Sequence, residues 1–145
     1  MSAWELAQLN IAEMRGPLES PAMADFVANL DRINATAESA KGFIWRLKTD
    51  DGNATALRPM GDHILINVSV WRDVDALKEF VYRSAHAPIM RRRREWFEGL
   101  RQANMVLWWV PAGHHPSEAE AIARLEQLRN SGPSADAFTF QVPFA

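Results

Sequence analysis

Hydrophobic and polar residues alternate along several short segments of the chain, which is the pattern of half-buried β-strands. The clearest example is residues 63–71, where one face carries only β-branched side chains, namely Ile64, Ile66, Val68 and Val70. Similar patterns predict strands at residues 6–12, 43–47 and 105–110. Residues 138–144 also alternate, which predicts a terminal strand with three phenylalanines and a valine on one face.

Helical spacing fills the intervals between these strands. Apolar residues that recur on one helical face predict a helix over residues 21–39. Asp73 is expected to cap a second helix, which Pro88 interrupts and which then resumes and ends near Gly99. Residues 117–120 form a capping box, so a third helix should follow them.

The resulting order, β-α-β-β-α-β followed by α-β, predicts an α+β protein with a ferredoxin-like antiparallel sheet and helices on one face. The opposite, apolar face then needs a cover, and a second copy of the same sheet would supply it. We therefore expect a homodimer joined through its sheet faces, a dimeric α/β barrel, with the tail strand helping to close the interface. One domain should span residues 1–145, with a core at about 4–111 and an extension at about 117–145.

Composition narrows the partners and the compartment. The chain has 145 residues, of which 48% are hydrophobic and 23% charged, as in an ordinary globular domain. A net charge of −2 argues against nucleic-acid binding. No apolar run approaches the roughly 18 residues that span a bilayer, and the N-terminus lacks a signal-peptide pattern. With no cysteine in the sequence, the expected location is the cytoplasm, away from membranes.

The helix break at Pro88 predicts a pocket. The proline frees the carbonyl of Ser84 and places it close to His86, whose charge state changes near neutral pH. Tyr82 lies one turn earlier on the same face. His86 is therefore a candidate proton-transfer residue, and a purely structural histidine is the alternative.

Polar side chains on otherwise apolar strands form the second group of candidates. Gln8 with Asn10, and Asn67 with Ser69, would line a cavity, or else lie at a solvated sheet edge. Three tryptophans would supply apolar walls for a ligand, namely Trp45, Trp71 and Trp108.

Charged and histidine side chains outside the helix break give fewer candidates. Of the arginines at 91–94, Arg94 is the better candidate for an anion contact, and Arg46 is another. His114 and His115 have no acidic or histidine partner at ligand spacing, so we interpret them as loop residues and expect no metal.

Five strings in the sequence resemble the DUF3291 family, and together they extend over essentially the whole chain. They are LAQLNIA (6–12), GFIWRL (42–47), NVSVW (67–71), AHAPIMRRRREWF (85–97) and VLWWVPAGHHPSEAEA (106–121). The resemblance implies a dimeric α/β-barrel, ferredoxin-like fold. It implies no reaction, because the function of this family is unknown.

A more distant similarity is to the antibiotic-biosynthesis monooxygenase superfamily, including its haem-degrading members. It rests on Asn10 in the first strand, on Val-Trp at 70–71 and on Ala-His at 85–86. The interval between the last two pairs is shorter here, and Ala76 stands near the place where those relatives carry a catalytic tryptophan. We therefore expect no cofactor. Haem, with His86 as its axial ligand, is the disfavoured alternative.

Two classes of function agree with these features. The first is a small monooxygenase- or cyclase-like enzyme acting on an apolar or aromatic molecule, with His86 and Asn10 as catalytic residues. In such an enzyme Asn10 and Asn67 would orient a carbonyl or oxygen while His86 moves a proton. The second is a non-catalytic dimeric protein that binds a small ligand in the same pocket.

Overall fold

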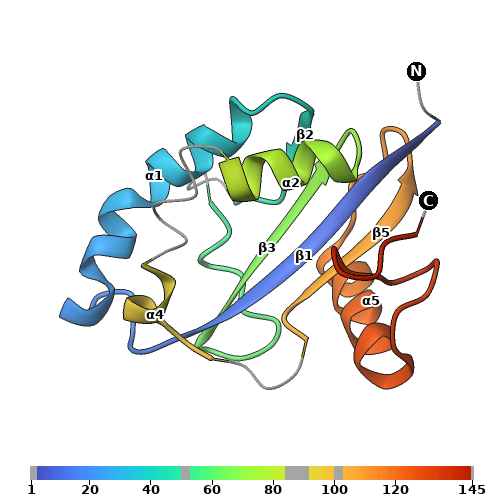
Figure 1. Cartoon of the computed structure of the whole chain (residues 1–145). Helices are drawn as coiled ribbons and strands as arrows, with labels where there is room; N and C mark the ends of the chain where they lie inside the picture. Colours follow the sequence, from blue (N-terminus) through green and yellow to red (C-terminus); the bar gives the residue numbers. More distant parts are fainter. Residues whose placement is uncertain (1–2, 50–52, 84–91, 100–102, 145) are drawn as a thin grey trace.

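The structure is a computed structural model that describes residues 3–49, 53–83, 92–99 and 103–144, and all structural statements below refer to these ranges (Figure 1). The strands are β1 (Trp4–Met14), β2 (Phe43–Arg46), β3 (Ile64–Trp71), β4 (Phe97–Glu98) and β5 (Met105–Pro111). The helices are η1 (Pro21–Met23), α1 (Ala24–Glu38), α2 (Val74–Arg83), α4 (Arg93–Trp96) and α5 (Glu118–Ser131).

The strands form one antiparallel sheet with β1 at its centre. One edge of β1 pairs with β3, which in turn pairs with β2. The other edge pairs with β5 along residues 4–10 and with β4 at residues 13 and 14. The order β2-β3-β1-β5 is that of a ferredoxin-like α+β fold, which confirms the predicted fold class.

The two faces of the sheet carry different helices. The face with the β-branched row of β3 packs against α5 through Ala121, Leu125 and Leu128. The opposite face, called the helix face below, packs against α2 through Ala76, Leu77 and Phe80. Figure 1 shows α1 and α2 beside the β2–β3 part of the sheet and α5 beside β5. The predicted arrangement is therefore found for α1 and α2, whereas α5 lies on the other face.

The position of α5 removes the main argument for a dimer. The apolar residues of β1, β3 and β5 that were expected to need a partner sheet are already buried within one chain. They are covered by α5 and by Leu57 and Met60 of the loop between β2 and β3. The homodimer therefore stays a prediction without that support. Among the described residues, no helix is both long and apolar enough to cross a membrane.

Two predicted helix starts are confirmed by their hydrogen bonds. The Asp73 carboxylate accepts a hydrogen bond from the Ala76 N–H at 2.8 Å, at the start of α2. The Ser117 hydroxyl accepts one from the Glu120 N–H at 3.1 Å, at the start of α5. These side chains satisfy backbone donors that the first helical turn leaves free, which fixes where each helix begins.

Two predicted elements are wrong. No strand forms at residues 138–144; Phe138 alone bridges β5, at Leu107, and its ring is buried on the helix face. The helix expected to end near Gly99 ends at Trp96, because Phe97 adopts an extended conformation and pairs with Met14. In both places the apolar residues pack into the core without continuing the regular element that their pattern suggested.

Gly42 precedes β2 in a backbone conformation that favours glycine. Its φ is +88°, and a Cβ there would lie 2.5 Å from the Cβ of Ala76. Gly113 has the same φ of +88°, but a Cβ at that position would meet no atom within 4 Å, so Gly113 isolates the backbone effect.

We expect Gly113→Ala to lower the free energy of unfolding by about 1 kcal/mol, because alanine is strained at this φ. Gly42→Ala should lower it by about 1–3 kcal/mol more, because the added methyl group also clashes with Ala76. Urea denaturation of both variants measures the difference. Equal denaturation midpoints would contradict the close approach of Gly42 to α2.

Candidate functional site

Five polar side chains lie together on the helix face of the sheet. This polar strip consists of Gln8 and Asn10 of β1, Arg46 of β2, and Asn67 and Ser69 of β3. Asn10 is the register partner of Asn67, while Ser69 is the partner of both Gln8 and Arg46. Residues directly opposite each other in an antiparallel pair project to the same side, with Cβ atoms about 5 Å apart. The strip therefore crosses three neighbouring strands.

Hydrogen bonds within the strip fix the orientation of its side chains. The Gln8 side-chain amide donates to Asn67 Oδ1 at 2.6 Å and to Ser69 Oγ at 2.7 Å. The Trp71 indole N–H also donates to Ser69 Oγ, at 2.8 Å. Because Asn67 Oδ1 accepts the hydrogen bond from Gln8, the Asn67 amide nitrogen keeps its two N–H groups for other partners. Gln8 and Ser69 are buried, so their bonds satisfy groups that would be costly to leave unpaired.

Asn10 and Asn67 are exposed, although they lie on the two central strands of the sheet. Apolar clusters bound this open part of the helix face at both ends. Trp71 and Phe80 belong to one cluster, and Met14 and Trp96 belong to the other. The two asparagines therefore form a polar floor between two apolar walls.

Helix α1 spans the distance between the two clusters. Phe26, near its start, packs against the Trp96 cluster, and Ala37, near its end, packs against the Trp71 cluster. No residue of α1 is buried, and its middle residues Leu30 and Ile33 are only half-buried. Half-buried apolar side chains of α1 therefore lie between the two clusters.

Arg46 adds a positive charge to the strip. Its side chain is 10% exposed, and its Nε lies 3.4 Å from Glu38 Oε2 at the end of α1. The same carboxylate lies 3.9 Å from Lys48 Nζ. Because little water surrounds the Arg46 guanidinium, its charge acts on a neighbouring group more strongly than a surface charge does.

The predicted site residues separate into several groups. Asn10, Arg46, Asn67 and Trp71 lie on the helix face, and Trp71 is buried in the apolar cluster at one end of the strip. His86 lies outside the described residues. Trp45 and Trp108 pack into the core of the opposite face, so the interpretation of all three tryptophans as walls of one pocket is wrong.

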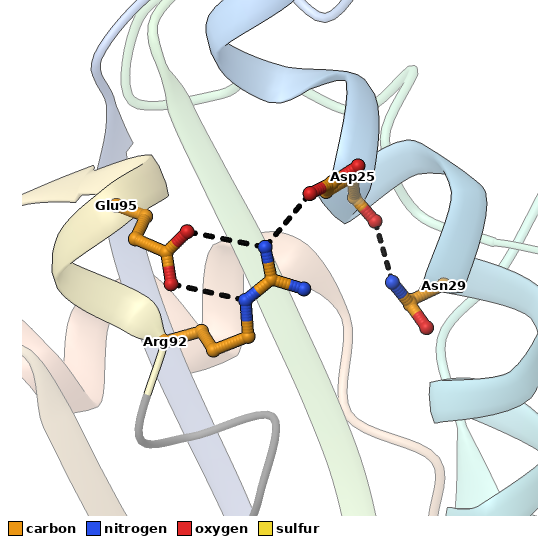
Figure 2. A network of polar contacts seen from close by, with 4 residues as sticks. All are labelled: Asp25, Asn29, Arg92 and Glu95. Atoms are coloured by element: carbon orange, nitrogen blue, oxygen red, sulfur yellow. Dashed lines mark hydrogen bonds and ion pairs between the residues drawn. The ribbon is translucent and has the colours of Figure 1, made fainter.

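Tyr82 and Arg94 lie at the periphery. Tyr82 is 63% exposed on α2 and contacts the Phe140 ring. Arg94 is exposed, and among the described arginines at 92–94 it is Arg92 whose side chain forms ion pairs. Its Nη2 lies 2.8 Å from Asp25 Oδ2, and its Nε lies 3.0 Å from Glu95 Oε2, so it connects α4 to α1 (Figure 2).

The ion pairs of Arg92 change the proton affinities of the groups that form them. Hydrogen bonds to Glu95 and then to Asp25 raise the pKa of Arg92 above its already high value. The hydrogen bond from Arg92 lowers the pKa of Glu95. Arg92 also lies over the Trp96 ring, 4.8 Å from its centroid. These contacts brace the two helices beside the site, and they hold the charge of Arg92 away from the polar strip.

Sequence analysis did not predict the hydrogen-bond partner of His114. His114 Nε2 lies 2.6 Å from Glu120 Oε1, and the other oxygen of this carboxylate accepts the Trp108 indole N–H at 3.0 Å. The capping box did mark Glu120, but it predicted that the side chain would turn back toward the helix start. Because Trp108 and His114 come from β5 and the turn after it, only the packing of α5 on β5 brings them to Glu120.

The fold and the strip together define a small ferredoxin-like α+β protein with a polar floor on the face of its sheet that packs against α2. The profile of DUF3291, a domain of unknown function, matches residues 5–145, and the chain belongs to this family. No curated protein sequence is significantly similar to the chain.

Solved structures share the fold at low sequence identity. PA3566 from Pseudomonas aeruginosa is 14% identical with a TM-score of 0.51, covering 79% of this chain and 98% of its own. SnoaB, a cofactor-independent oxygenase from Streptomyces nogalater, is 19% identical with a TM-score of 0.47 over the same shares of the two chains. A dabb family protein with a ferredoxin-like fold from Mesorhizobium loti is 14% identical with a TM-score of 0.46, covering 75% of this chain and 99% of its own. These similarities concern the fold alone.

Proposed function

We propose that the protein is a small monooxygenase- or cyclase-like enzyme that binds an apolar or aromatic molecule over the polar strip. One observation carries the proposal: Asn10 and Asn67 are exposed at the centre of a sheet face whose surroundings are apolar. Binding sites for small organic molecules typically combine apolar walls with a few oriented polar groups. The strip and its two flanking clusters have this composition.

The oriented groups suit a ligand oxygen that carries or develops negative charge. Asn67 offers N–H donors whose direction is fixed through Gln8, and Arg46 adds a poorly hydrated guanidinium whose charge is shared with Glu38. Preorganised donors of this kind stabilise an enolate or phenolate oxygen, and loss of one donor typically costs about 10²–10³ in rate. Such an anion is the reactive form of an aromatic substrate in both oxygen addition and ring closure.

Non-catalytic binding of the same ligand is the second candidate. The side chains of the strip are amides, a hydroxyl and a guanidinium, and none of these groups is a general base. A proton acceptor would have to come from elsewhere, and the candidate for that role, His86, lies outside the described residues. The two functions therefore differ in whether His86 matters for turnover.

The donor role of Asn67 is tested by Asn67→Leu, which keeps a similar shape and removes both N–H groups. Asn130→Leu on the exposed side of α5 is the matched control. The probe is 1-naphthol at a pH above its own pKa, where it is the naphtholate anion. We expect Asn67→Leu to weaken its binding by about tenfold or more, as for a lost hydrogen bond to a charged group. Calorimetric titration measures this affinity. Equal affinities for Asn67→Leu and the control would contradict a ligand site on the strip.

The choice between enzyme and binding protein needs a turnover measurement. A set of hydroxylated naphthalenes, incubated with the protein in air, would be followed by oxygen uptake and by mass spectrometry of the products. An enzyme should lose turnover in His86→Ala while its affinity changes little. Tight binding with no product from any member of the set would favour the binding protein.

A further inference from the structure

A concave region lies at the end of the sheet where β1 begins and β5 ends. This open groove has a volume of about 860 Å³ and lies between the ends of these two strands, the first turns of α5, and residues 135 and 136. Its size is within the range of about 300–1,000 Å³ that is usual for small-molecule sites. Trp4 and Trp109 supply aromatic surface, and the polar lining comes from His114, Glu120, Arg124 and Asp136.

Glu120 acts in this groove by holding His114. One carboxylate oxygen accepts the Trp108 N–H and the other contacts His114 Nε2, so both are engaged. Burial raises the pKa of Glu120, but the hydrogen bonds from His114 and Trp108 and the charges of His114 and Arg124 outweigh it, leaving the pKa below its ordinary 4.5.

Arg124 supplies the main positive charge of the groove. Its side chain is half-buried, and its Nη1 donates to the Asp136 backbone carbonyl at 3.0 Å. Within the described ranges, no carboxylate lies at ion-pair distance from Arg124. Asp136 is exposed, so water screens its negative charge more than it screens the guanidinium. Arg124 is therefore the group of the groove lining that can bind an anion.

We propose that the groove binds a small aromatic carboxylate. The ring would lie against Trp4 and Trp109, and the carboxylate would meet Arg124. A guanidinium suits this role because its planar donors match the two oxygens of a carboxylate. The proposal does not depend on the function proposed for the polar strip, since the two sites share no residue.

Fluorine NMR with 4-fluorobenzoate tests the site directly. We expect saturable binding to the whole chain, weakened by about tenfold or more in Arg124→Gln because a charge-assisted contact is lost. Arg129→Gln is the matched control, since Arg129 lies on the same helix but donates to the Ala103 carbonyl, outside the groove. Circular dichroism would test whether both variants are folded. Arg124→Lys, which keeps the charge, should recover part of the affinity.

Two further comparisons decide the chemistry of the ligand. Neutral 4-fluorobenzyl alcohol and cationic 4-fluorobenzylamine should bind much more weakly than 4-fluorobenzoate. Trp4→Leu should lower the affinity for 4-fluorobenzoate. Asn67→Leu should leave benzoate affinity unchanged. The proposal is overturned if benzoate does not bind, if the amine binds as well as the acid, or if Asn67→Leu reduces binding while Arg124→Gln does not. The last result would instead place the anion on the polar strip.

Discussion

Replacing Trp108 with alanine should lower the free energy of unfolding by about 3–5 kcal/mol, as expected for a buried aromatic residue. The side chain is fully buried between the sheet and α5, and its indole N–H donates to Glu120. The change would leave a cavity in the core and remove a donor from a carboxylate. Since domains of this size are typically stable by about 5–15 kcal/mol, urea denaturation should show a large shift.

Trp108→Phe separates the ring from its N–H. This variant keeps most of the apolar contact, so the expected loss is about 1–2 kcal/mol. Part of that loss should depend on pH, because the hydrogen bond from Trp108 helps to depress the pKa of Glu120. A depressed folded-state pKa adds stability above the ordinary value of 4.5, and this stability is lost as the pH falls through the folded-state pKa.

The difference between the wild-type chain and Trp108→Phe should accordingly be larger at pH 7 than at acid pH, where Glu120 is protonated in both. Repeating the comparison in a Glu120→Gln background removes the titrating group and should abolish this pH dependence. A pH dependence that persists in that background would show that other groups cause it.

Periodicity predicted the elements whose buried face follows a simple repeat. The β-branched row of β3 has a period of two, and the apolar line of α5 has helical spacing, and both form where expected. Neither repeat says which side of the sheet a helix will cover. The position of α5 depends on the packing of Leu125 and Leu128 against β1 and β5, which brings together residues far apart in sequence.

The tail shows a different limit of sequence reasoning. Its alternation places Phe138 and Phe140 on one side, as a strand would, yet only Phe138 pairs with β5. Phe138 and its neighbours instead cover Leu107 on the helix face. The alternating pattern therefore predicted the burial of Phe138 correctly. It predicted the hydrogen bonding of the tail wrongly, because the apolar side chains are buried by packing without the backbone pairing of a strand.

The polar strip was predictable in part. Gln8, Asn10, Asn67 and Ser69 are conspicuous because they interrupt apolar strands, and the structure brings these four together on one face. The sequence could not supply the register that pairs Asn10 with Asn67, nor the bond by which Gln8 orients the Asn67 amide. Register depends on the whole ladder between two strands, and the spacing within one strand does not encode it.

Replacing Trp71 with alanine should cost about as much stability as the change at Trp108, again about 3–5 kcal/mol. Trp71 is 1% exposed, and its ring lies edge-on to Phe43 at 5.4 Å and stacks on Phe80 at 5.1 Å. The two tryptophans belong to separate clusters on opposite faces of the sheet. Their effects on stability should therefore be nearly additive in the double variant.

Trp71 should also influence the polar strip, which distinguishes it from Trp108. Its indole N–H holds Ser69, and Ser69 in turn accepts a hydrogen bond from Gln8, which orients Asn67. Trp71→Phe keeps the ring contacts and removes this N–H, so we expect a modest loss of stability together with weaker binding of 1-naphthol. Trp108→Phe is the control that should leave this affinity unchanged. If Trp71→Ala instead weakened binding with a stability loss below about 1 kcal/mol, the side chain would be a ligand wall and not part of the core.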